Sequence, residues 1–261
     1  MKSLGALPIL LGFLVLQGLA AIEFAIGGGQ AFVPRLSEVL AGLGPLAAAL
    51  SFDREDPPRR AWMILGVALS LVSLSRVIGY FGVELGGVSG KLITVIISNI
   101  LCVIGMFTLS RVLRGSGLTP EWTEHTGLRN AIIGIVILLT GASGYVFYEL
   151  FAPGLPSDIS GIINATATVI STIGDLLICS IGLFLVWLVR PMMGGSVAQP
   201  FLLVAAGGGV FIVVDVLTVL QRVTTSDQFT SPLHIGMAIF AWTAFALGGF
   251  AQLRVLRSGE R

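Results

Sequence analysis

Charge is scarce in this sequence. Only 11% of its 261 residues are charged, whereas soluble domains carry about a quarter. Hydrophobic residues make up 55% of the chain, and the mean hydropathy is +0.96. The formal net charge of +1 favours neither nucleic acid nor an acidic partner. This composition predicts a polytopic membrane protein with no nucleic-acid partner.

The residues of common metal, cofactor and catalytic sites are also rare. Cys102 and Cys179 are too few for a disulfide framework or a metal site, and both lie in apolar runs. No lysine lies in the middle of an apolar stretch, which excludes a retinal Schiff base at mid-membrane depth. No phosphate-binding loop, nucleophile elbow or zinc-binding helix occurs. We therefore expect a protein that is not an enzyme and has no metal site, and no cofactor can be named.

Long apolar stretches recur along the whole chain. Most of them approach or exceed the ~20 residues that cross the ~30 Å hydrocarbon core. The second is the weakest, because Glu38 and Pro45 interrupt it, and without it the chain would have seven spans and its ends on opposite sides. The sequence predicts an all-α fold, a single transmembrane domain over 1–261, with eight helices at 4–27, 36–52, 61–83, 91–111, 130–151, 165–189, 200–221 and 233–253.

Lysine and arginine fall mostly in alternate loops, which predicts the orientation. With eight spans and a cytoplasmic N-terminus, the outside segments contain only Arg35, Lys91 and Arg222. The inside segments contain Lys2, Arg54, Arg59, Arg60, Arg111, Arg114, Arg129, Arg190, Arg254, Arg257 and Arg261. We expect a multi-pass protein of the inner (plasma) membrane with both termini in the cytoplasm. His125 and His234 then lie on opposite sides, which disfavours a haem held by both.

Ionisable or strongly polar residues interrupt several of the apolar stretches, namely Glu23, Arg76, Asn99, Asp175 and Asp215. A charge at the centre of a membrane costs ~2.5–3.5 kcal/mol on insertion scales, so such residues usually face a partner or a water-filled cavity. In the predicted topology they gather in the outer half of the membrane. The inner half contains almost no titratable residue, which disfavours a proton pump.

Helical spacing groups these residues into faces. Arg76 and Tyr80 share one face of the third predicted span, and Phe211 and Asp215 share one face of the seventh. The glycines at 207–209 predict a close approach of the seventh helix to a neighbour.

These faces predict an outward-facing polar pocket. Its candidate ligand-binding residues are Arg76, Tyr80, Asn99, Asp175 and Asp215. The alternative is that buried ion pairs and amide hydrogen bonds of the same residues only fix the helix packing, with Arg76 pairing with Glu23 for stability.

The C-terminal half carries a more specific pattern. It contains Ile173-Gly174-Asp175-Leu176-Leu177, Arg190-Pro191, the run Leu202-Leu203-Val204-Ala205-Ala206-Gly207, and Val214-Asp215-Val216. Over roughly 165–253 this resembles the N-terminal multi-helix membrane module of bacterial sensor proteins, the diguanylate cyclase and histidine kinase receptors. The resemblance implies that Asp175 and Asp215 match the acidic positions of that module. No output domain follows residue 253, so we expect signalling to require a partner.

Two kinds of function follow from this reading. The first is a sensor-like integral membrane protein, acting either as an accessory subunit docked on a protein partner in the membrane or as a binder of a small ligand or lipid in the outward-facing pocket. Membrane lipids are expected partners in both cases. The alternative is a small secondary transporter or channel, although we find no inverted symmetry between the two halves of the chain.

Overall fold

A computed structural model describes several positions between 11 and 22 and the ranges 32–82, 84–85, 88–119, 125–152, 154, 158–224 and 227–259. Most of the predicted first span, 4–27, lies outside the described residues, and so does Glu23.

The described part of the chain is almost entirely helical, which confirms the all-α prediction. The helices are α2 (Phe32–Leu50), α3 (Pro57–Tyr80), α4 (Gly90–Gly115), α5 (Thr126–Phe151), α6 (Ile159–Val189), α7 (Gln199–Thr224) and α8 (Asp227–Gly259). A short antiparallel hairpin of β1 (Glu84–Leu85) and β2 (Val88–Ser89) joins α3 to α4, with Glu84 opposite Ser89. The 3-10 helix η1 (Arg190–Met192) follows α6, where Pro191 cannot continue the α-helical hydrogen bonds.

Among the described helices, 4 are long and apolar enough to cross a membrane. They cover Leu92–Gly115, Thr126–Phe151, Gly161–Met192 and Leu233–Ser258. The apolar part of α7, Gln199–Asp215, is shorter. These helices support an integral membrane protein, and the count of eight spans stays a prediction.

Helix α2 is continuous through Glu38 and Pro45, the two residues that weaken its predicted span. Pro45 lies inside the helix without ending it. The buried carboxylate of Glu38 forms an ion pair with Arg35 one turn earlier, with 3.4 Å between Arg35 Nη1 and Glu38 Oε2. This pairing offsets part of the unfavourable free energy of burying the Glu38 charge.

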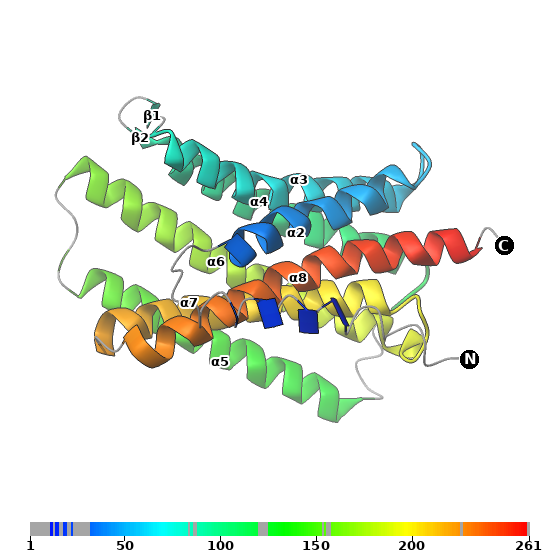
Figure 1. Ribbon diagram of the computed structural model, residues 1–261. Helices are drawn as coiled ribbons and strands as arrows, with labels where there is room; N and C mark the ends of the chain where they lie inside the picture. Colours follow the sequence, from blue (N-terminus) through cyan, green and yellow to red (C-terminus); the bar gives the residue numbers. More distant parts are fainter. Residues whose placement is uncertain are drawn as a thin grey trace.

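The helices close into a ring from which α5 is left out. Contacts run from α2 to α3, α3 to α4, α4 to α6, α6 to α7, α7 to α8, and from α8 back to α2 (Figure 1). Helix α5 packs less extensively on α6 and α7 from outside the ring, and its buried residues are Leu139, Ser143 and Val146. The inside of the ring therefore contains side chains from helices far apart in sequence.

Consecutive helices alternate in direction, so the loops collect at two ends of the bundle (Figure 1). At one end lie loop 51–56, the residues after α4, η1 and the last turn of α8. This end, which we call the arginine-rich end, carries the described arginines Arg54, Arg59, Arg60, Arg111, Arg114, Arg129, Arg190, Arg254 and Arg257. The opposite end carries β1 and β2 and is called the hairpin end. Which end faces the cytoplasm stays a prediction.

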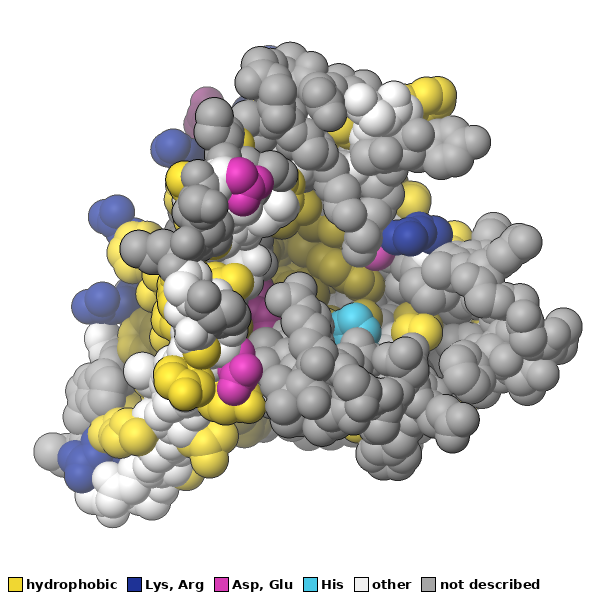
Figure 2. Space-filling view, turned by 90° about the vertical axis from the view of Figure 1, so that its left-hand side faces the viewer, with side chains coloured by type: hydrophobic (Ala, Val, Ile, Leu, Met, Phe, Trp, Pro, Cys, Tyr) yellow, Lys and Arg dark blue, Asp and Glu magenta, His cyan; other side chains and the backbone are white. Residues whose placement is uncertain are grey.

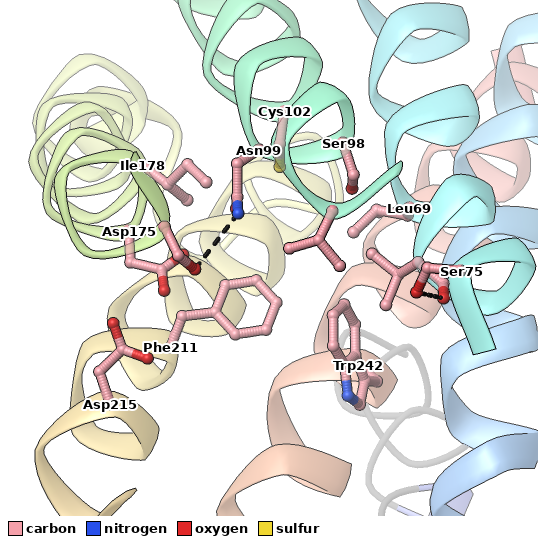
Figure 3. A pocket seen from close by; sticks show the side chains of 13 residues that line it. Leu69, Ser75, Ser98, Asn99, Cys102, Asp175, Ile178, Phe211, Asp215 and Trp242 are labelled. Atoms are coloured by element: carbon pink, nitrogen blue, oxygen red, sulfur yellow. Dashed lines mark hydrogen bonds between the residues drawn. The ribbon is translucent and has the colours of Figure 1, made fainter. Parts of the chain in front are cut away.

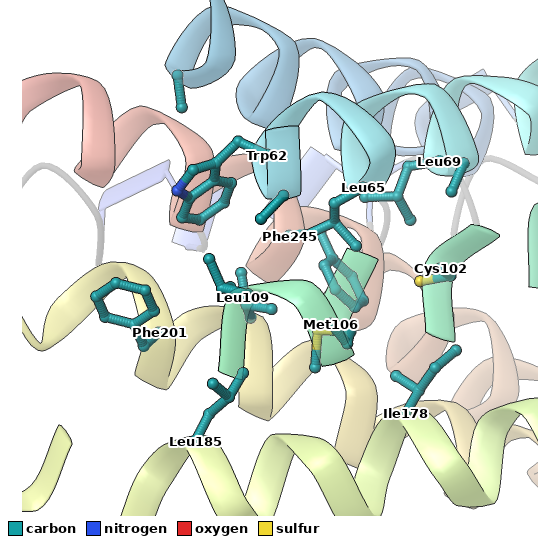
Figure 4. Packing of buried hydrophobic residues seen from close by; sticks show 14 of the residues in the cluster. Trp62, Leu65, Leu69, Cys102, Met106, Leu109, Ile178, Leu185, Phe201 and Phe245 are labelled. Carbon is teal, nitrogen blue, oxygen red and sulfur yellow. The ribbon is translucent and has the colours of Figure 1, made fainter. Parts of the chain in front are cut away.

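An apolar core fills the half of the ring nearer the arginine-rich end. Trp62 and Leu65 from α3 meet Met106 and Leu109 from α4 and Phe245 from α8, all of them almost completely buried (Figure 4). Burying a large apolar side chain of this kind contributes roughly 1.5–3 kcal/mol in water. In a bilayer, the same side chains act mainly through close packing.

Small residues set the distances between neighbouring helices. A Cβ added to Gly207 would lie 2.8 Å from the Phe245 ring of α8, and one added to Gly208 would lie 2.8 Å from Ile178 of α6. The close approach predicted from the glycines at 207–209 is therefore confirmed. A Cβ on Gly249 of α8 would overlap the backbone of Gly44 in α2, so the ring closes there on two glycines.

Candidate functional site

The ring surrounds a partly open cavity of about 250 Å³ in the half nearer the hairpin end. Side chains of α3, α4, α6, α7 and α8 line it, and Leu69, Cys102 and Ile178 belong both to its wall and to the apolar core. Its polar lining is Ser75, Ser98, Asn99, Ser171, Asp175 and Asp215. Viewed from the hairpin end, the surface has a hollow with hydrophobic side chains at its bottom (Figure 2).

Two carboxyl groups from adjacent helices meet in this cavity. Asp175 of α6 and Asp215 of α7 both line the cavity, and their carboxyl groups face each other (Figure 3). The side chain of Asp175 is almost fully buried, at 7% exposure. The Oδ2 atom of Asp215 is buried and has no hydrogen-bond partner among the described residues. Two facing carboxyl groups are unfavourable when both are charged, unless a cation lies between them, and otherwise one of them holds a proton.

An amide and a hydroxyl connect α4 to α6 at the same level. Asn99 Nδ2 donates to Ser171 Oγ at 3.2 Å, and both residues line the cavity. Ser171 lies one helical turn before Asp175, so this hydrogen bond and the carboxyl pair share one face of α6. A Cβ added to Gly174 would lie only 3.3 Å from the Asn99 Cβ, and this close approach brings α4 and α6 together beside the cavity.

Aromatic rings form the opposite wall. Phe211 of α7 meets Trp242 of α8 edge to face, with 4.7 Å between ring centroids and 64° between ring planes. On its other side it stacks on Phe245 at 5.5 Å. The Phe211 ring lies between the carboxyl pair and Trp242 (Figure 3). The cavity thus combines an acidic side and an aromatic side.

Comparison with protein-family models, curated proteins and solved structures finds no match to this chain. Among the described residues, no group of three or more His, Cys, Asp and Glu side chains is placed to hold a metal ion.

The structure brings together three of the candidate site residues, since Asn99, Asp175 and Asp215 all line the cavity. Arg76 and Tyr80 belong to α3 by their backbone, but their side chains lie outside the described part of the chain. The preceding residue, Ser75, does line the cavity.

Several lining residues were not singled out from the sequence. Ser171 could have been found, because it lies one turn before Asp175 in an apolar helix. Trp242 carries no such signal: it comes from α8, and only the packing of α8 against α7 brings it to Phe211. Ser98 was missed because its partner is a backbone carbonyl, with Ser98 Oγ donating to the Ala68 oxygen of α3 at 2.7 Å.

Proposed function

We propose that this chain is an integral membrane protein that binds a small ligand in the cavity inside the ring and responds by shifting its helix packing, as a sensor module would. The observation that carries the proposal is that Asp175 and Asp215 face each other in the wall of a cavity inside a mainly apolar bundle. Placing a carboxyl group inside a membrane-spanning helix costs free energy, and such groups usually face a polar partner or a water-filled cavity.

The arrangement of the polar groups supports a coupling between binding and packing. Asn99 comes from α4, Asp175 from α6 and Asp215 from α7, so one ligand can contact helices that are separated by loops. A ligand that contacts these groups more favourably in one packing than in another shifts the population toward that packing. The open Oδ2 of Asp215 offers one contact that the protein itself does not satisfy.

This geometry favours ligand binding over the accessory-subunit role. The polar groups point into the ring, whereas the outside of α5 carries exposed apolar residues such as Ile137 and Leu138, at 66% and 70% exposure. An apolar outer face suits contact with lipid tails and requires no protein partner. The polar groups of the described helices that could bind a ligand therefore line the cavity inside the bundle.

Native mass spectrometry of the protein purified in a mild detergent tests the proposal. We expect the wild type to retain a small molecule, and Asp175→Asn to lose it. The matched control is Asp158→Asn, because Asp158 lies far from the cavity and caps the N-terminus of α6, where asparagine is an equally good cap.

Retention of the same molecule by Asp175→Asn contradicts the proposal, and so does a wild type that holds nothing and is stabilised by no small molecule. Stoichiometric retention of another membrane protein in place of a small molecule would favour the accessory-subunit reading. Solute flux in vesicles that is lost in Asp175→Asn would favour the transporter reading.

A further inference from the structure

We infer that the ligand of this cavity is a small organic cation, an ammonium ion with a short apolar chain, held between the Asp175–Asp215 pair and the rings of Phe211 and Trp242. This inference rests on the ligand-binding function proposed above and adds the chemical class of the ligand.

The first argument is the supply of hydrogen-bond acceptors. The hydroxyls of Ser75 and Ser98 donate to the backbone oxygens of Val72 and Ala68, at 2.6 and 2.7 Å, so their free lone pairs remain for a ligand. The Asn99 amide donates to Ser171. With the open Oδ2 of Asp215, these groups make a lining that accepts hydrogen bonds, which suits a ligand that donates them.

The second argument is charge. Two facing carboxyl groups are favourable together only when one is protonated or a cation lies between them. An ammonium ion balances the single negative charge of a half-protonated pair and donates hydrogen bonds to its oxygens. Hydrogen bonds between an ammonium ion and a carboxylate are about twice as strong as those between neutral groups. A cationic ligand therefore balances the negative charge that the carboxyl pair places in the cavity.

The third argument is the aromatic wall. A cation within ~6 Å of an aromatic face is attracted by the ring, and the gain is ~2 kcal/mol or more where water is excluded. Phe211 lies one helical turn before Asp215, so its ring and the carboxyl group share a face of α7. The Trp242 indole extends this wall from α8.

The size and ligand set argue against a bare metal ion. The described residues offer no cluster of three or more His, Cys, Asp or Glu side chains, which are the usual ligands of transition metals. A volume of about 250 Å³ is several times the ~30 Å³ of one water molecule and lies just below the ~300–1,000 Å³ of pockets for drug-sized ligands. The space fits an amine with a few carbon atoms.

Thermal unfolding of the full chain in a neutral detergent tests the inference. The probe is n-butylammonium chloride, compared with n-butanol, which has the same chain without the charge, and with sodium chloride at equal ionic strength. We expect the melting temperature to rise and saturate with butylammonium only. The apparent Kd should weaken at least about tenfold in Asp215→Asn, consistent with the loss of a hydrogen bond to a charged group. It should not change in Asp158→Asn.

Other outcomes separate the two proposals. Equal stabilisation by n-butanol, or by sodium chloride, overturns the cation inference but leaves a ligand-binding cavity if the effect depends on Asp175. Binding of butylammonium only in Arg76→Gln also overturns it, because the chain's own arginine then occupies the pair. If no probe stabilises the wild type and no native molecule is retained, both the inference and the proposed function fail.

Discussion

Asn99 on α4 donates its side-chain amide to the hydroxyl of Ser171 on α6, with 3.2 Å between Nδ2 and Oγ. The hydrogen bond joins two helices that are separated in sequence by the whole of α5. It lies at the edge of the cavity, beside Asp175. The α4–α6 contact thus both closes the ring and fixes one wall of the candidate site.

A double-mutant cycle measures this connection. Asn99→Ala and Ser171→Ala should show a coupling of about 0.6 kcal/mol, with ~1.7 as the upper limit for hydrogen bonds between membrane helices. The measurement is the free energy of unfolding in mixed detergent micelles. Thr168→Val is the control partner, because the Thr168 hydroxyl donates to the Asn164 oxygen of its own helix at 3.0 Å. Additive effects for Asn99→Ala with Ser171→Ala would contradict the connection.

Asp215→Asn should stabilise the protein in the absence of ligand. The substitution removes a carboxylate oxygen without a partner and places an amide donor beside Asp175. An unsatisfied buried polar group costs about 1–3 kcal/mol, and binding sites commonly retain such a loss of stability. The melting temperature without ligand checks this, with Asp158→Asn as the neutral control. A clear loss of stability would indicate that the carboxyl pair serves packing.

The sequence predicts much of this fold, because apolar length and the positions of arginine follow directly from the cost of polar groups in a membrane. The ring itself could not be predicted. Its closure depends on Gly249 fitting against Gly44 and on α4 packing on α6 past α5, and both are contacts between distant segments. Neither hydropathy nor helical spacing reports which helices become neighbours.

The candidate site shows the same division. Asn99, Asp175 and Asp215 stand out in the sequence because polar side chains are rare in apolar stretches. Helical spacing places Phe211 on the same face as Asp215, but neither Phe211 nor Trp242 stands out as a site residue, since aromatic residues are ordinary in such stretches. Only the packing of α7 against α8 shows that these rings form a wall of the same cavity.

Gly249→Ala should destabilise the bundle. An added methyl group would overlap the Gly44 backbone, and overpacking of this kind costs about 1–3 kcal/mol. Gly141→Ala is the matched control, because nothing lies within 4 Å of a Cβ at Gly141 in α5. Alanine there should stabilise the helix by about 0.5–1 kcal/mol. Equal melting temperatures for the two variants would contradict the close approach of α2 and α8.

Cysteine labelling should assign the two ends of the bundle to opposite sides of the membrane. Ser51 and Ser196 are exposed at the arginine-rich end, and Ala152 is exposed where α5 ends at the hairpin end. Single cysteines at these positions would be introduced into a Cys102→Ala, Cys179→Ala background, which removes the two buried native thiols.

An impermeant maleimide should label Ala152→Cys in intact spheroplasts, and Ser51→Cys and Ser196→Cys only after permeabilisation. The reason is that arginine-rich loops are retained in the cytoplasm. If only Ser51→Cys and Ser196→Cys are labelled in intact spheroplasts, the orientation is the reverse of the predicted one and the fold is unaffected. Different accessibility of Ser51→Cys and Ser196→Cys would contradict the alternating helix directions, because both belong to the same end of the ring.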